Sequence, residues 1–112
     1  MIRRSFTATV ARNETWVGQA ATEPYEAAWA GEAIFFIRAL EAAVPLAEAV
    51  ARVQISPDGI HWCDEGTAFG LPTAAGQVTF GRVRHFGGYL RLVAALPPGA
   101  MCKVIVALVL KE

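Results

Sequence analysis

Apolar and polar residues alternate with a period of two through most of the second half of the chain, which is typical of β-strands. Turn residues separate the alternating runs: Pro57-Asp58-Gly59, Gly87-Gly88 and Pro97-Pro98-Gly99. A further alternation near the start, Phe6 to Val10, indicates a first strand. The pattern therefore predicts a loop over 65–76 and strands over 6–10, 53–56, 60–63, 78–83, 89–93 and 101–111.

The segment 32–53 fits two patterns. Ala33, Phe36, Ile37 and further apolar residues recur at helical spacing, and alanine and glutamate favour helices. Pro45 opposes a helix because it removes a backbone donor and clashes with the preceding turn, and the run from Ile34 to Ile37 is rich in strand-forming residues. We favour a strand over 33–42, a loop over 45–49 and a strand over 50–56, and a helix remains the alternative.

The last predicted strand is apolar on both faces. Val104, Val106, Leu108 and Leu110 share one face, and Ile105, Ala107 and Val109 share the other. Such a strand is usually covered on both sides. We expect a second sheet on one side and a loop, a crossing segment or another subunit on the other.

Composition supports one folded domain spanning residues 1–112. The 112 residues include 54% hydrophobic residues and carry no net charge, so a sizeable core is expected and disorder is not. Residues 1–30 contain the first strand and a connection with three large aromatic side chains, and residues 31–111 form the main part of the β-sandwich. Short strands separated by glycine and proline turns predict an all-β fold, a single antiparallel β-sandwich of jelly-roll type with about seven or eight strands.

The N-terminal segment and the most apolar run of the sequence bear on where the protein is located. Arg12, Asn13 and Glu14 interrupt the apolar stretch that a secretory signal would need after the basic N-terminus. The most apolar segment, Val104 to Leu110, is far shorter than the roughly 20 residues of a membrane-spanning helix. We expect no signal peptide, no membrane segment, and a cytoplasmic or virion-associated protein.

Two motifs carry a resemblance to a known group of domains. Ser56-Pro57-Asp58-Gly59 is followed by Trp62 after two residues, and Tyr89-Leu90-Arg91 lies in a later strand. Together with the final apolar strand, this order resembles the small jelly-roll, discoidin-like β-sandwich modules of phage virion proteins and of uncharacterised bacterial proteins. The resemblance covers roughly residues 30–111. It implies a β-sandwich fold and a role in surface decoration, self-assembly or ligand attachment.

Charge is unevenly distributed along the chain. Residues 1–13 carry three arginines, residues 14–65 carry nine acidic and two basic side chains, and residues 66–111 carry five basic side chains and no acid. The middle segment thus has a charge of −7 and the last one of +5. Opposite charges on paired strands within one domain explain this best, and complementary faces of identical subunits are the alternative.

Metal and catalytic chemistry find little support in the sequence. His61 and Cys63 share a strand face, but the paired spacing of a structural zinc site with His85 and Cys102 is missing. Calcium needs more oxygen ligands than Asp58, Asp64 and Glu65 provide, and Asp58 suits a turn. The serines, Ser5 and Ser56, have no nucleophile motif around them. We expect no enzyme activity, no cofactor and no metal.

Arginines and aromatic residues raise the question of nucleic-acid binding. Arg82, Arg84 and Arg91 lie in consecutive predicted strands near Phe86 and Tyr89, and such a stripe can contact RNA. With no excess of positive charge, we instead expect these arginines to pair with acids, either Glu41 or Glu48 or those of a neighbouring subunit. No nucleic-acid partner is expected.

These observations favour a structural role. The sequence predicts a non-enzymatic module that self-associates and builds or decorates a larger assembly, such as a virion or bacterial shell. Its predicted interface consists of Phe35, Ile37, Ile105, Ala107 and Val109. The alternative is a carbohydrate-binding or adhesion module that uses Trp16, Tyr25 and Trp29 as an exposed platform.

Overall fold

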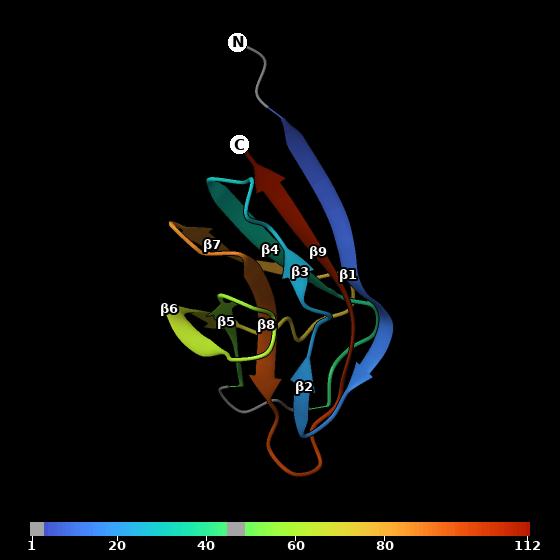
Figure 1. The fold of residues 1–112 in the computed structure, drawn as a ribbon. Helices are drawn as coiled ribbons and strands as arrows, with labels where there is room; N and C mark the ends of the chain where they lie inside the picture. Colours follow the sequence, from blue (N-terminus) through green and yellow to red (C-terminus); the bar gives the residue numbers. More distant parts are fainter. Residues whose placement is uncertain (1–3, 45–48) are drawn as a thin grey trace.

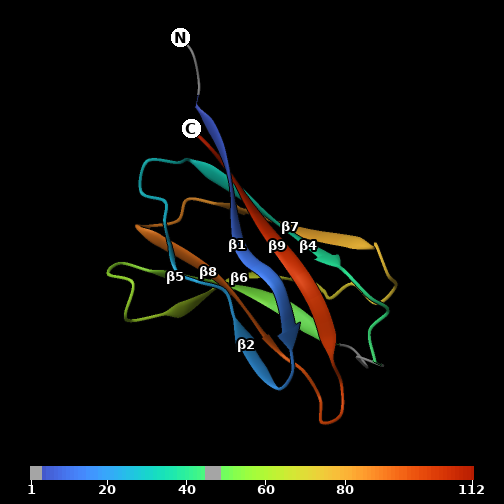
Figure 2. The same ribbon diagram turned by 90° about the vertical axis from the view of Figure 1, so that its right-hand side faces the viewer.

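The chain folds into two layers of β-strands (Figures 1 and 2). A computed structural model describes residues 4–44 and 49–112. The described strands are β1 (Ser5–Trp16), β2 (Gln19–Ala21), β3 (Tyr25–Glu26), β4 (Glu32–Ala39), β5 (Val50–Ser56), β6 (Cys63–Gly70), β7 (Val78–Arg84), β8 (Tyr89–Ala95) and β9 (Cys102–Lys111). No helix of the described chain is long and apolar enough to cross a membrane.

The strand order is that of a jelly roll. One sheet has the order β1-β9-β4-β7, the other has the order β2-β8-β5-β6, and β3 also pairs with β8. All of these pairs are antiparallel. Most connections cross from one sheet to the other, as in double-sheet jelly rolls. The predicted all-β sandwich is therefore confirmed, and we call the two layers sheet A (β1, β9, β4, β7) and sheet B (β2, β3, β8, β5, β6).

β2 and β3 form one interrupted strand along β8. Between them, the backbone N–H of Thr22 donates to the carbonyl of Leu92 at 2.9 Å. The Thr22 hydroxyl accepts the Leu92 N–H at 2.9 Å, so a side chain takes the place of a strand carbonyl. Counting β2 and β3 as one strand gives the eight strands of a jelly roll.

The segment with two possible patterns contains strands. β4 and β5 occupy 32–39 and 50–56, so the helical alternative is wrong. β4 pairs with β7 on one side and β9 on the other, and each pairing satisfies backbone groups that a helix would satisfy internally. Residues 45–48 of the predicted loop lie outside the described residues.

The predicted turn after Ser56 is confirmed, but the predicted strand over 60–63 and the predicted loop from 65 are wrong. Residues 57–61 form a bend, and the strand begins at Cys63 and runs through much of the predicted loop to Gly70. The N–H groups of Ile60 and His61 both donate to the Asp58 carboxylate at 2.8 Å. Because a side chain takes these two donors, they are not available to a neighbouring strand.

The core lies between the two sheets. Its largest fully buried side chains come from β4, β8 and β9 and include Phe35, Ile37, Leu90, Leu92, Leu108 and Leu110. At one edge the sheets approach each other, where the Thr67 hydroxyl of β6 donates to the Arg82 carbonyl of β7 at 3.2 Å. The ring of Phe69 covers Gly81 there, since a Cβ at that position would lie 2.5 Å from the ring. Each sheet thus packs one face against the core and has its other face on the outside of the molecule.

Candidate functional site

Sheet A presents apolar side chains on the face that points away from the core. These residues, called the apolar face below, are Ile34 and Phe36 of β4, Val78 and Phe80 of β7, and Ile105, Ala107 and Val109 of β9. Val78 and Phe80 are 50% and 45% exposed, and the others are half-buried. Figures 1 and 2 show two layers of strands and no third layer of described chain over this sheet.

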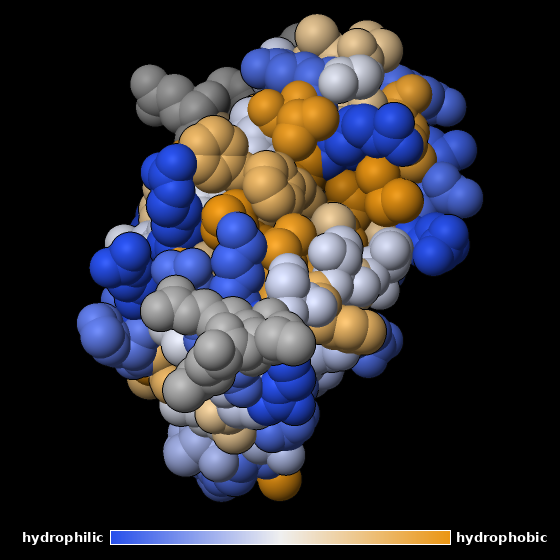
Figure 3. Space-filling model, turned by 90° about the horizontal axis from the view of Figure 1, so that it is seen from above, coloured by the Kyte–Doolittle hydropathy of each residue, from blue (hydrophilic) through white to orange (hydrophobic). Residues whose placement is uncertain are grey.

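The strand register brings these side chains together. Phe36 lies opposite Phe80 on one side and Ala107 on the other. The rings of Phe36 and Phe80 are 6.0 Å apart between centroids and tilted by 37°, within the range in which aromatic pairs attract. Figure 3 views the molecule from above, and hydrophobic side chains gather in one area of that surface with hydrophilic side chains around them.

Two shallow hollows interrupt the apolar face. The larger has a volume of about 280 Å³ and lies among Thr9, Phe36, Arg38, Val78, Ile105 and Ala107. The smaller has a volume of about 160 Å³ and lies beside Ile34 and Val109. The face can therefore accept small protruding groups of a partner without rearrangement of its strands.

The rim of the apolar face is basic. Arg38, Arg82, Arg84, Lys103 and Lys111 project from the same side of sheet A. Two of them are paired: Arg84 with Glu32 at 3.7 Å and Lys103 with Glu41 at 3.8 Å. Among the described residues, Arg38 and Arg82 form no ion pair, and the Arg82 guanidinium lies 5.0 Å above the Phe80 ring. Five bases against two acids leave three excess positive charges around an apolar centre.

The predicted interface residues separate into two groups. Ile105, Ala107 and Val109 lie on the apolar face as expected. Phe35 and Ile37 are 0% exposed and belong to the core, so their placement on an interface is wrong. They face inward because residues opposite each other on paired strands point to the same side of the sheet. Phe35 lies opposite Leu108 and Ile37 lies opposite Val106, and both of these β9 residues are buried in the core.

The face also contains residues that the sequence analysis missed. Ile34 and Phe36 occupy the outward positions of β4, and Val78 and Phe80 those of β7. Every residue from Ile34 to Ile37 is apolar, so alternation alone does not say which two of them face outward. In β7, Val78 and Phe80 are two residues apart, and Arg82 and Arg84 continue the same spacing. All four side chains therefore lie on one side of the strand, and the arginines indicate that this side faces solvent.

The predicted aromatic platform does not form as expected. Trp16 is 2% exposed, and its ring N–H donates to Glu14 at 3.2 Å. Tyr25 and Trp29 are half-buried and packed against the core. The Tyr25 ring stacks on Phe6, and the Arg4 guanidinium lies 4.8 Å above the Trp29 ring. A platform that includes Trp16 is therefore wrong, because that side chain belongs to the core.

Two of the candidate metal ligands, Cys102 and Asp58, make contacts within the fold. Cys102 is buried and its thiol donates to the Pro72 carbonyl at 3.6 Å, while Cys63 is exposed. Asp58 organises the turn after β5, and its carboxylate contacts the ring Nδ1 of His61 at 2.7 Å. In residues 4–44 and 49–112, no three His, Cys, Asp or Glu side chains form a group that could hold a metal ion.

The arginines considered for RNA binding do not form one stripe. Arg82 and Arg84 project from sheet A, whereas Arg91 lies on the outer face of sheet B, where its guanidinium stacks 4.3 Å above the Trp62 ring. Its Nε donates to Gln54, and Gln54 in turn donates to Asp64 at 3.0 Å. Glu41 pairs with Lys103 rather than with an arginine, and Glu48 lies outside the described residues. The outer face of sheet B is thus polar where that of sheet A is apolar.

Comparison with known proteins adds no relative from which a function can be inferred. The chain matches no protein-family model, no curated protein and no solved structure at a significant level.

Proposed function

We propose that this chain is a non-enzymatic β-sandwich module that associates with copies of itself through the apolar face and so builds or decorates a larger protein assembly. The single observation that supports this most strongly is the row of Phe80, Phe36 and Ala107 across three strands, which leaves two phenyl rings in contact with solvent. Contiguous apolar patches with a polar rim mark interaction sites on proteins.

The size of the face suits an association surface. Four strands about 4.8 Å apart, each contributing about seven residues of about 3.3 Å, span on the order of 450 Å² in projection. Stable interfaces hide about 800 Å² on each partner. The outer face of sheet A therefore supplies more than half of such an interface, and neighbouring loops can supply the rest.

A second copy is the partner that the charges favour. The apolar face has a basic rim, and the net charge of the chain is zero, so the rest of the chain carries an equal excess of negative charge. A second copy can therefore supply the negative charge that complements the basic rim. Complementary charges of this kind direct association and exclude other orientations.

The test compares two single substitutions by size-exclusion chromatography with light scattering. Phe36→Asp places a charge at the centre of the apolar face, and Val17→Asp places one at another exposed valine, 56% exposed between β1 and β2. We expect the parent chain and Val17→Asp to exceed the monomer mass of 12.0 kDa and Phe36→Asp to elute as a monomer. Equal masses for Phe36→Asp and the parent chain would exclude the apolar face as the contact.

A further inference from the structure

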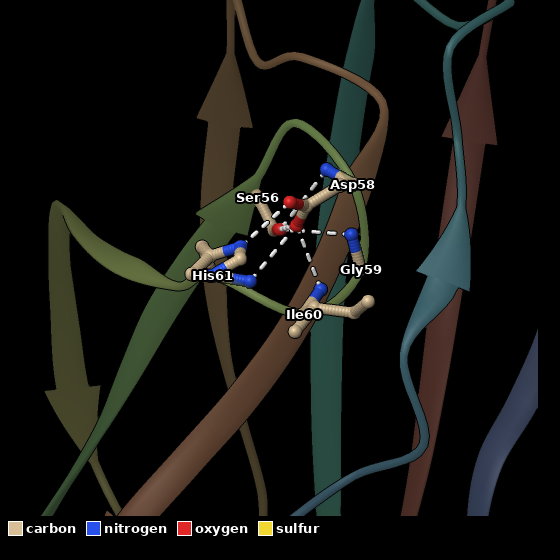
Figure 4. A network of polar contacts seen from close by, with 5 residues as sticks. All are labelled: Ser56, Asp58, Gly59, Ile60 and His61. Carbon is tan, nitrogen blue, oxygen red and sulfur yellow. Dashed lines mark hydrogen bonds and ion pairs between the residues drawn. The ribbon is translucent and has the colours of Figure 1, made fainter.

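The turn after β5 is held in one shape by its own polar groups (Figure 4). The Asp58 carboxylate accepts hydrogen bonds from Ser56 Oγ at 3.0 Å and from the N–H groups of Ile60 and His61 at 2.8 Å. The Ser56 hydroxyl accepts the N–H of Asp58 at 3.2 Å and of Gly59 at 2.9 Å. A turn with so many internal hydrogen bonds loses little conformational freedom when a partner binds it.

This rigid turn displays an apolar side chain at its tip. Ile60 is 74% exposed, the largest exposed fraction among the large hydrophobic side chains of residues 4–44 and 49–112. In Figure 4 its side chain points away from the polar contacts around Asp58. Nothing in the turn itself requires isoleucine there, because Ile60 contributes only its backbone N–H to the hydrogen bonds.

The surroundings of Ile60 are acidic. Asp58, Asp64 and Glu65 lie in this turn and at the start of β6. His61 contacts Asp58, and Arg91 of β8 stacks on Trp62 beside the turn, so three acids outnumber one arginine there. The turn belongs to sheet B, whereas the apolar face lies on the outer side of sheet A. The turn of one copy therefore cannot reach the apolar face of the same copy.

We propose that the turn of one copy, with Ile60 at its tip, docks onto the apolar face of the next copy. This inference rests on the proposed function and specifies the partner surface. Ile60 would enter the hollow of about 280 Å³ bordered by Phe36, Val78 and Ile105. The acids around Ile60 would then face Arg38 and Arg82, the two rim arginines without an ion pair in the described chain.

The geometry of this contact decides the kind of assembly. Two different surfaces meet, so each copy keeps a free turn at one end and a free apolar face at the other. Head-to-tail contacts of this type build closed rings or open filaments rather than a closed dimer. A contact between two apolar faces would instead bring two basic rims together, which is unfavourable.

The experiment mixes two chains that are each blocked on one surface. Ile60→Lys blocks the turn, because it brings a positive charge toward the basic rim, and Phe36→Asp blocks the face. Each variant alone is expected to have the monomer mass of 12.0 kDa. An equimolar mixture is expected to form a one-to-one pair of about twice that mass, since the intact turn of Phe36→Asp fits the intact face of Ile60→Lys. Sedimentation velocity measures all three samples, with Val17→Lys as the matched control, which should assemble like the parent chain.

Each outcome separates this inference from the proposed function. If Ile60→Lys assembles like the parent chain, the turn is not the contact, while association through the apolar face stands. If both variants are monomeric and the mixture stays monomeric, the two surfaces do not meet and the inference is wrong. If the parent chain itself is a monomer, both proposals fail. Pairing in the mixture would show that both variants are folded. Ile60→Ala provides a second test: it adds no charge and is expected to weaken assembly at least tenfold.

Discussion

Individual polar side chains determine where this chain leaves the regular pairing of its sheets. The Asp58 carboxylate takes the backbone donors of Ile60 and His61, and the Thr22 hydroxyl takes that of Leu92. Both side chains compete with strand carbonyls for N–H groups, as short polar side chains do in turns. The first produces the exposed turn of the proposed contact, and the second divides the strand along β8 in two.

The Asp58 turn is expected to persist in mild acid. The backbone hydrogen bond from His61 is the main cause that holds the pKa of Asp58 well below its usual range, followed by the contact with the His61 side chain and the N–H of Ile60. Its folded pKa lies below the unfolded value of about 3.9, so its contribution to stability is complete above that pH and is lost as the pH falls through the folded pKa. The NMR signal of its carboxyl carbon should show no protonation step between pH 5 and pH 3. A step with its midpoint near pH 4 would contradict these hydrogen bonds.

The two cysteines are expected to differ in reactivity. Cys63 is exposed, whereas Cys102 is 0% exposed and burial raises the pKa of its thiol. Because the thiolate is the reactive form, Cys102 should react only after unfolding. Titration of the native protein with Ellman's reagent should show one fast thiol, lost in Cys63→Ser, and a second thiol in denaturant. Two thiols reacting at the same rate in the native state would place Cys102 at the surface.

At the scale of elements, β4 has two apolar sides with different roles. Phe35 packs into the core and Phe36 lies on the apolar face, although the two are neighbours in a continuous apolar run. The pairing with β9 distinguishes them, since Leu108 opposite Phe35 is buried and Ala107 opposite Phe36 is only half-buried. Stability and association should therefore respond to different residues of the same strand.

Alanine substitutions at these two neighbours should separate the roles. Phe35→Ala removes a fully buried ring and is expected to lower the free energy of unfolding by about 3–5 kcal/mol. Phe36→Ala removes a ring on the outer face and should cost the monomer less than about 1.5 kcal/mol. Urea denaturation at a concentration where the chain is monomeric measures both. A larger loss for Phe36→Ala than for Phe35→Ala would reverse the two faces of β4.

The contact between the edges of the two sheets depends on a glycine in β7. A Cβ at Gly81 would lie 2.5 Å from the Phe69 ring and 3.2 Å from the Thr67 methyl group. Gly81→Ala is therefore expected to cost about 1–3 kcal/mol through overpacking. Gly70→Ala is the matched control, because no atom lies within 4 Å of its added Cβ, and it should change stability by no more than about 0.5 kcal/mol. Equal thermal stability of the two variants would show that Phe69 does not pack on β7.

Sequence periodicity predicted the strands whose alternation is strict and bounded by turn residues, including 53–56, 78–83 and 89–93. It missed β6, because Gly66 and Gly70 resemble loop residues and the strand is defined by its pairing with β5. The apolar face was predicted in part for a related reason. Alternation in β9 separates Ile105 from its buried neighbours, but a run that is apolar at every position, as in β4, needs its partner strand to fix the orientation.

At the scale of the whole molecule, the hydrophobic share of 54% and the uneven charge distribution have one explanation. The core between the sheets uses one set of apolar residues, and the outer face of sheet A carries a second set. Basic residues of β7 and β9 surround that second set, and acids lie around the exposed turn of sheet B. The basic rim of sheet A and the acids near the turn are the charges that the proposed contact would bring together.

The most direct test of self-association is the mass of the unmodified chain in solution. Sedimentation equilibrium over a wide range of protein concentrations gives this mass without assumptions about shape. We expect it to rise with concentration above the monomer value of 12.0 kDa, because each head-to-tail contact leaves a free surface for another copy. A mass of 12.0 kDa at every concentration would contradict the proposed assembly.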